Sequence, residues 1–414
     1  MASGFTWLDY SDGERRRVLD VVRSLSEHDT RDELGLATVR DSLADLLAPG
    51  ISTLQARPRY FLFVPWIYQG IEARVRTRSA SVTKDWITRK ARNAEVELID
   101  CLLEAGESAG VIGSWSGKAL KRLPSSIYWS GLEAWGMRLC PWSIDRYHHR
   151  LAVYGPPART AVDDACGAWP NWNPGLPPAP DGFPEGATME LTPPEAEYLR
   201  DRILEKQPNT LLGQLVLGGD AVADLDYPWS ALDHGIEIAP GVARVVRHAR
   251  EFSVAMHGAV LVYNLMLAEA HPAQREDWVQ TYRDRIADWV QEVRHRWADF
   301  AAWDRAEFWR TVEGTGANIP LRTRRFVNAW LDRLLSAADP ASMAGDASMR
   351  SLIDNREREL KRAQARLHNP RLLEIWNGDT GSGVGRMNYR WPVMRQHLAD
   401  IHAGLVQPAE AAHA

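Results

Sequence analysis

The segment AMHGAVLVYNLMLAE, residues 255–269, lies within a predicted helix over 242–270 and indicates the fold class. Apolar residues recur at three- and four-residue intervals elsewhere too, and turn residues bound these runs. The further predicted helices cover 11–25, 38–47, 57–78, 82–104, 193–206, 210–217, 274–302, 305–312, 321–337 and 348–367. No alternating strands joined by hairpin turns and no internal repeat stand out. The chain is therefore predicted to be mainly α, a multi-helix globular protein.

Local signals refine these ranges. Pro65 interrupts the run at 57–78 and predicts a kink or a helix start there. Thr192, Pro193 and Glu195 are typical of a helix start with a capping box. Pro49-Gly50 ends the helix at 38–47.

The composition is that of a soluble globular protein and excludes several classes. Of the 414 residues, 45% are hydrophobic and 25% are charged, which excludes wholesale disorder, collagen and a disulfide scaffold. The three cysteines are far apart and no histidine cluster has zinc-ligand spacing, so neither a metal nor a cofactor is expected. No secretory signal and no apolar run of about 18 residues is found, which predicts a cytoplasmic protein without a membrane partner.

Two residue types are unusually distributed. The chain has 18 Trp, and only six of its 49 Lys and Arg residues are lysine. Codon bias explains an arginine excess, but arginine also binds phosphates in bidentate fashion. The net charge of −5 argues against a uniformly basic coat and permits a local basic groove. Most tryptophans of the C-terminal half fall at helical spacing, which favours the core: Trp278, Trp289, Trp297 and Trp303.

A stretch rich in Pro and Gly divides the sequence. Residues 155–191 can form neither a helix nor a central strand. Trp169, Trp172 and Phe183 within it suggest a packed, ordered loop rather than a plain linker. The expected organisation is a helical region over 1–154 with candidate nucleic-acid-binding segments, the loop over 155–191, and a second helical region over 192–414.

The densest polar cluster lies between residues 28 and 66. Hydroxyl, amide and guanidinium groups that follow one another in a loop can bind phosphates and read base edges. Helix caps and salt bridges are the alternative explanation of the same residues. The candidate DNA-binding residues here are Arg40, Ser52, Thr53, Gln55, Arg57 and Arg59. The candidate catalytic carboxylates are Asp32, Glu33 and Asp41, with Asp9 in reserve.

Residues 111–138 form a second candidate. Basic residues precede a turn and then an aromatic helix, as in a helix-turn-helix or winged-helix recognition element, and Ser125 or Ser126 could cap that helix. A capped amphipathic helix with Trp129 and Trp135 in the core explains the pattern equally well. The candidate DNA-binding residues are Lys118, Lys121, Arg122, Ser125, Ser126 and Tyr128.

The glycine-rich run GDTGSGVGRMNYRW, residues 378–391, lacks the Lys-Ser/Thr pair of a nucleotide-binding P-loop. A flexible loop with its backbone close to a ligand is the favoured interpretation. Four residues in or before it could contact phosphates or be surface charges and caps: Asn369, Arg371, Arg386 and Arg390.

Polar residues also interrupt the apolar helix quoted first. Buried polar groups need partners, so satisfied core residues are the favoured interpretation of His257, Tyr263 and Asn264. The alternative is a polar lining for an inserted base. The candidate base or sugar pocket then comprises Trp129, Trp169, Trp172, His257, Tyr263 and Asn264.

Several segments resemble a bacterial family of unknown function that occurs in anti-phage defence loci. They are FTWLDYSDGERRR, DTRDELGLATVRDSLADLLAPGISTLQARPRYFLFVPWIYQ, LKRLPSSIYWSGLEAWGMR, HGAVLVYNLMLAEA and NPRLLEIWNGDTGSGVGRMNYRWP. The resemblance implies a defence role on phage DNA, beside protein partners such as helicases, methylases or nucleases. The chain is also similar to defence DNA glycosylases that remove glucosylated hydroxymethylcytosine. The resemblance carries over no catalytic residue.

The chemistry of a monofunctional glycosylase fits the absence of metal and nucleotide motifs. Such an enzyme flips a nucleotide and needs one carboxylate to orient water and stabilise an oxocarbenium-like sugar. The hairpin of helix-hairpin-helix glycosylases is not found, and LAPGIS at 47–52 resembles it only faintly. The alternative function is a non-catalytic DNA-recognition subunit that recruits a nuclease or helicase. A nuclease is a third option, although its acidic metal-binding pattern is not evident.

Overall fold

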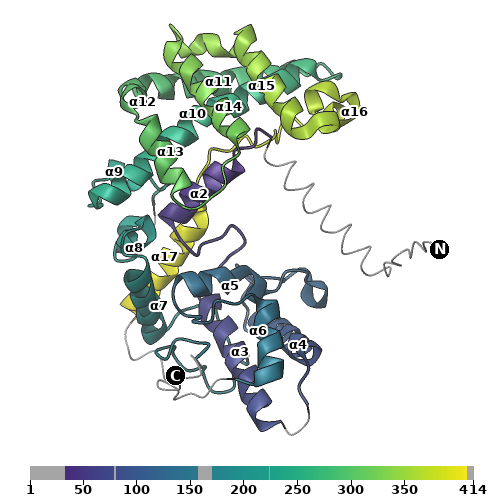
Figure 1. The fold of residues 1–414 in the computed structure, drawn as a ribbon, viewed down its shortest axis with the longest axis vertical. Helices are drawn as coiled ribbons and strands as arrows, with labels where there is room; N and C mark the ends of the chain where they lie inside the picture. Colours follow the sequence, from purple (N-terminus) through teal and green to yellow (C-terminus); the bar gives the residue numbers. More distant parts are fainter. Residues whose placement is uncertain (1–32, 79–80, 157–169, 223, 408–414) are drawn as a thin grey trace, which may run out of the picture. The chain divides into compact units, whose positions relative to one another are not determined.

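The computed structural model describes residues 33–78, 81–156, 170–222 and 224–407, and these residues form mainly helices (Figure 1). An isolated antiparallel bridge between Arg138 and Trp172 is the β feature recorded in this part of the chain. The predicted mainly α class is confirmed. The predicted helix at 11–25 and the candidates Asp9, Asp32 and Trp169 lie outside the described residues.

By its internal contacts the chain divides into two compact units. The first consists of Met1–Ser42 and His248–Met387, and the second of Leu43–Arg247 and Asn388–Ala414. The chain passes between them within helix α2 (Ala37–Leu47), within α10 (Pro240–Ala270) and after Met387. Each unit is therefore assembled from two separate stretches of sequence.

The second unit is built around α3, which packs against α4, α5 and α6, while α17 packs along α7. The start of α3 is apolar on all sides, and such a helix needs burial on all sides. The ring of Phe61 stacks on that of Trp135 with centroids 3.9 Å apart. The helices of this unit are α3 (Tyr60–Thr77), α4 (Lys84–Glu104), η1 (Gly117–Ala119), α5 (Pro124–Ala134), α6 (Ile144–Tyr154), α7 (Pro193–Lys206), α8 (Leu211–Leu215), η2 (Gly219–Val222), α9 (Ser230–Asp233) and α17 (Trp391–Val406).

The first unit surrounds α10 from His248 onward. Gly258 lets α11 approach this helix, because a Cβ atom at that position would lie 2.2 Å from the ring of Trp289. Trp289 is buried and donates a hydrogen bond from Nε1 to the carbonyl of Val254 at 2.8 Å. The other helices of this unit are α11 (Glu276–His295), α12 (Trp297–Ala302), α13 (Arg305–Glu313), α14 (Leu321–Ser336), η3 (Pro340–Ala344), α15 (Ala347–Lys361), η4 (Arg362–Gln364), η5 (Arg366–His368) and α16 (Pro370–Glu374).

The described part of the proline-rich stretch, residues 170–191, packs against α3 within the second unit. The ring of Phe183 stacks on Phe63, with 5.7 Å between centroids. Trp66 donates from Nε1 to the carbonyl of Pro177 at 2.8 Å. These contacts fix the loop against the buried face of α3.

The helix ends show where the sequence signals were sufficient. α7 covers the predicted 193–206 and begins with the predicted capping box of Thr192 and Glu195. The predicted helix at 274–302 is interrupted at Arg296, where α11 ends and α12 begins. Pro65 lies inside α3, so the alternative of a helix start there is wrong. Helices α6, α9, α16 and α17 were not predicted.

One described helix, α10, is long and apolar enough to cross a membrane by length and composition alone. Within its most apolar window, 83% of the residues are buried inside the protein. A core helix of a soluble protein has these same properties.

Candidate functional site

A cavity of about 580 Å³ lies beside α3 in the second unit. One face of α3 contributes Gln69, Glu72 and Arg76, which follow the three- and four-residue spacing of a helix. The proline-rich loop contributes Asn171 and Asn173 on either side of Trp172. Backbone hydrogen bonds from Leu139 to Asn171 at 2.9 Å and from Asn173 to Met137 at 2.8 Å hold this part of the loop in place.

Glu72 is the only acidic residue among the described residues that line this cavity, and its side chain is buried. Its Oε1 accepts hydrogen bonds from Asn171 Nδ2 at 2.8 Å, from Trp172 Nε1 at 3.1 Å and from the Tyr147 hydroxyl. The nearest cation is Arg76, with Nη2 at 3.9 Å from Oε2. Three neutral donors therefore orient the carboxylate through one oxygen, while the other has only a distant guanidinium among the described residues.

Aromatic side chains support the donors to Glu72. Burial, and then the charge of Glu72, raise the pKa of Tyr147 well above its ordinary value, so its phenol stays neutral and donates. The ring of Tyr147 packs against those of Trp129 and Tyr68, with centroids 5.4 and 5.5 Å apart. Trp129 in turn packs edge-on against Trp172 at 6.0 Å. The candidate pocket residue Trp129 therefore lies behind the cavity and supports its wall.

The chemical groups of this cavity suit a hydroxyl-rich ligand. Amides donate to and accept from hydroxyl groups, and an indole ring offers an apolar surface beside them. A volume of about 580 Å³ falls within the range of roughly 300–1,000 Å³ usual for small-molecule sites. Among the described residues, no group of three or more His, Cys, Asp or Glu side chains could hold a metal ion.

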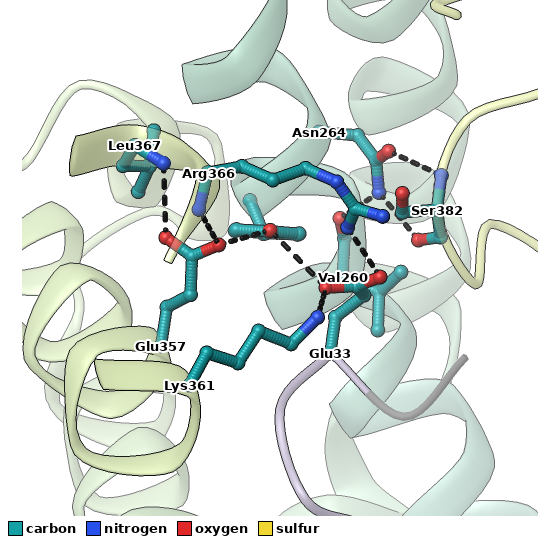
Figure 2. Close-up of polar contacts among 9 residues, drawn as sticks. Glu33, Val260, Asn264, Glu357, Lys361, Arg366, Leu367 and Ser382 are labelled. Carbon is teal, nitrogen blue, oxygen red and sulfur yellow. Dashed lines mark hydrogen bonds and ion pairs between the residues drawn. The ribbon is translucent and has the colours of Figure 1, made fainter. Parts of the chain in front are cut away.

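The candidate carboxylate Glu33 lies in a different, buried cluster in the first unit (Figure 2). Its oxygens contact the Lys361 ammonium and the Arg366 guanidinium, and Oε2 also accepts from the Tyr263 hydroxyl at 3.3 Å. The Tyr263 hydroxyl donates more closely to Glu357, at 2.6 Å. Both oxygens of Glu33 are thus occupied by cations of its own chain.

The polar residues of α10 find partners in the first unit. Asn264 receives a hydrogen bond from the Ser382 amide at 2.7 Å and donates to the Ser382 carbonyl at 2.9 Å (Figure 2). His257 Nε2 lies 3.1 Å from the carbonyl of Val384. Burial, with the charge of Arg386, lowers the pKa of His257 to about 4, so this ring is neutral at pH 7. These contacts anchor the glycine-rich loop and favour the interpretation of Asn264 as a satisfied core residue. His257 is satisfied at Nε2 only, because its buried Nδ1 has no hydrogen-bond partner among the described residues.

The candidate DNA-binding cluster at 52–59 makes contacts within the second unit. Arg57 Nε donates to Asp400 at 2.6 Å, and Arg59 Nη2 donates to Glu195 at 2.8 Å. Gln55 donates to the Gly50 carbonyl at 2.8 Å and accepts from the Ser52 amide at 3.2 Å. The Thr53 side chain is exposed. Most of this cluster is therefore engaged in holding the loop between α2 and α3.

The segment at 111–138 has a buried face and an exposed face. Ser125 donates through its amide and its hydroxyl to Glu95 at 2.7 and 2.8 Å, and Tyr128 donates to the Arg57 carbonyl at 2.8 Å. α5 begins at Pro124 with Leu123 as its N-cap, so the prediction that Ser125 or Ser126 caps it is wrong. Four candidate residues are exposed: Lys118, Lys121, Arg122 and Ser126.

An exposed tryptophan lies beside these basic residues in the sequence. Trp115 is fully exposed, two residues before η1, and was not singled out from the sequence. A tryptophan seldom stays in water without a partner, since its ring is the largest apolar side-chain surface. An exposed ring near basic residues is the arrangement on which single-stranded bases stack.

The remaining candidates are placed as follows. Asn369 caps α16 by accepting from the Leu372 amide at 3.3 Å, and Arg371 is exposed. Arg386 pairs with Glu292 at 2.6 Å. Arg390 pairs with Asp45 at 2.6 Å, and Arg40 pairs with its neighbour Asp41 at 3.0 Å.

Of the candidate pocket residues that the structure describes, only Trp172 lines the cavity beside α3. Sequence reasoning missed Glu72, Arg76, Tyr147 and Asn171. One signal was present for Glu72, an acid placed four residues after Tyr68 on a helix whose start is wholly apolar. Nothing in one sequence connects it to Asn171, which is 99 residues away.

These observations define a mainly α-helical protein with an oriented carboxylate at a small-molecule-sized, amide-lined cavity. The chain belongs to the family of unknown function DUF6361, whose model matches residues 2–404. No curated protein and no solved structure matches the chain.

Proposed function

We propose that this protein is a monofunctional DNA glycosylase of anti-phage defence, which excises a glucosylated cytosine in the cytoplasm. The observation that supports the proposal is Glu72, a buried carboxylate at a cavity of about 580 Å³, oriented by three neutral donors. The defence context comes from the sequence resemblance alone. We assign the catalytic role to Glu72 in place of the sequence candidates Asp32, Glu33 and Asp41.

Glycosylase chemistry assigns a role to each wall of the cavity. Cleavage of an N-glycosidic bond develops positive charge on the sugar, and a carboxylate nearby stabilises that charge and orients the attacking water. The Oε2 atom of Glu72 is the atom available for this role. Gln69, Asn171 and Asn173 are placed to bind hydroxyls of the attached glucose, and the Trp172 ring contacts its apolar face.

The DNA strand needs a second surface in the same unit. Trp115 and the exposed residues Lys118 and Arg122 offer stacking and phosphate contacts. They also support the second candidate function, a non-catalytic DNA-recognition subunit that recruits a nuclease or helicase. That function uses the surface around Trp115 and leaves Glu72 without a chemical role.

The experiment compares DNA that carries glucosylated hydroxymethylcytosine with unmodified DNA and measures abasic sites. We expect abasic sites only in the modified DNA, and we expect Glu72→Gln to lower their rate of formation by a factor of 100 or more. Glutamine retains the acceptor for the three donors, so binding of the modified DNA should persist. Glu104→Gln, an exposed acid of α4, is the matched control.

The outcomes separate the candidates. Binding without abasic sites in the unchanged protein contradicts the glycosylase and favours the recognition subunit. Full activity of Glu72→Gln, with a loss in Asp32→Asn, Glu33→Gln or Asp41→Asn instead, contradicts the assignment of the carboxylate. Strand cleavage that depends on Mg²⁺ identifies a nuclease.

A further inference from the structure

A groove of about 450 Å³ lies between α14 and α15 in the first unit. Its residues recur at the three- and four-residue intervals of one face on each helix. Phe326, Ala329 and Leu352 give it an apolar floor, while Arg322, Arg325 and Asn355 are exposed along it. The groove therefore combines two cations and an amide with an apolar surface.

Arg322 and Arg325 differ from their neighbours in having no carboxylate partner among the described residues. Between them in sequence, Arg324 pairs with Glu313 at 2.8 Å. On nearby elements, Arg305 pairs with Asp332 at 2.5 Å and Arg350 with Glu269 at 2.6 Å. Two unpaired arginines three residues apart repel each other, and both lie in the first turn and a half of α14, where the helix dipole is also positive. A bound anion offsets both costs.

The third arginine of the groove has a structural role. The buried Arg356 guanidinium donates to the carbonyls of Leu34 and Gly35 at 2.9 and 3.3 Å and to the Thr323 hydroxyl at 2.8 Å. It also pairs with Glu359 at 3.0 Å, which neutralises the only acid among the described residues that line the groove. Within the described part of the chain, Arg322 and Arg325 thus supply two positive charges without a carboxylate partner.

We propose that the groove between α14 and α15 binds the phosphate group of a nucleotide. Arg322 and Arg325 contact the phosphate oxygens, since paired guanidinium groups match phosphate geometry. The Asn355 amide binds a polar atom of the ligand. The sugar and base of the nucleotide lie on Ala329 and Leu352. The nucleotide is free or belongs to a DNA strand. This site is separate from the Glu72 cavity and does not rest on the glycosylase proposal.

The test uses the full chain and the double variant Arg322→Gln/Arg325→Gln. Arg324→Gln is the matched control, because it removes one charge from the same turn of α14 but does not line the groove. Calorimetric titrations use AMP as the free nucleotide and a single-stranded DNA 12-mer as the strand. Circular dichroism and thermal unfolding verify that each variant folds.

We expect the double variant to lose affinity at least tenfold for AMP, for the 12-mer or for both, whereas Arg324→Gln binds as the unchanged protein does. Loss for AMP identifies a free nucleotide, and loss for the 12-mer alone identifies a strand. In the strand case the slope of log K against log salt also falls by about 1.4, the value for two phosphate contacts on single strands. Arg322→Lys/Arg325→Lys should retain most of the binding.

Equal affinities of the double variant and Arg324→Gln for both probes overturn the proposal. So does an equal loss in the two variants, because the effect is then one of overall charge. A loss of binding in the double variant together with an unchanged rate of abasic-site formation supports the groove proposal, since Glu72 lies in the other unit. The two proposals can therefore fail independently.

Discussion

At the scale of single residues, two buried carboxylates differ in what surrounds them. Glu33 contacts the cations Lys361 and Arg366 directly, whereas Glu72 receives hydrogen bonds from neutral groups and has its nearest described cation, Arg76, at 3.9 Å. A carboxylate neutralised by its own protein has little charge left for a substrate. One held by neutral donors keeps its charge for chemistry.

This difference predicts opposite effects on stability. Glu33→Gln leaves two largely buried cations without their partner, and we expect the free energy of unfolding to fall by about 3 kcal/mol. Glu72→Gln keeps an acceptor for its donors and should change that free energy by less than about 1 kcal/mol. Urea denaturation of both variants measures the difference. An unchanged unfolding free energy for Glu33→Gln contradicts the buried ion pairs.

At the scale of elements, helical periodicity predicted most helices but not the side-chain contacts that join one helix to another. α7 was predicted to the residue because Thr192, Pro193 and Glu195 act locally. α17 was missed although Trp391, Met394 and Leu398 follow helical spacing, because polar residues such as His397 separate them and a glycine-rich run precedes them. The Glu72 site could not be predicted, since its donors come from α6 and a distant loop.

The contact between Glu95 of α4 and Ser125 of α5 predicts that the stability of the protein depends on pH. Burial raises the pKa of Glu95 from 4.5 to about 7, although hydrogen bonds from Ser125 oppose this shift. The folded state thus binds the proton more tightly than the unfolded state. The contribution of Glu95 to stability is fully present below pH 4.5 and is lost as the pH rises through about 7.

Glu95→Gln should remove this dependence. At pH 8 we expect the variant to be more stable than the unchanged protein by on the order of 2–3 kcal/mol, and at pH 4.5 to be about equal. Ser125 can donate its amide hydrogen to the glutamine oxygen and accept from the glutamine nitrogen, so both contacts persist. Urea denaturation across this pH range tests the prediction, with the exposed Glu97→Gln as control. A stability difference that does not vary with pH contradicts it.

At the scale of the whole molecule, the second unit depends on α17, which follows the first unit in the sequence. α17 buries Trp391, Met394, Leu398 and Ile401, each almost fully. At about 1.5–3 kcal/mol for each buried side chain, their removal costs roughly 6–12 kcal/mol. That is comparable with the 5–15 kcal/mol by which folded proteins are stable.

Ending the chain after Met387 should therefore unfold the second unit and leave the first. We expect limited proteolysis to degrade Leu43–Arg247 rapidly while His248–Met387 stays protected, since the first unit contains no part of α17. Ending the chain after Gln407 keeps α17 whole and is the matched control. Mass spectrometry of the fragments identifies the protected segments. Protection of Leu43–Arg247 in the shorter chain would mean that the contacts of α17 with α7, and of Asp400 with Arg57, are dispensable for this unit.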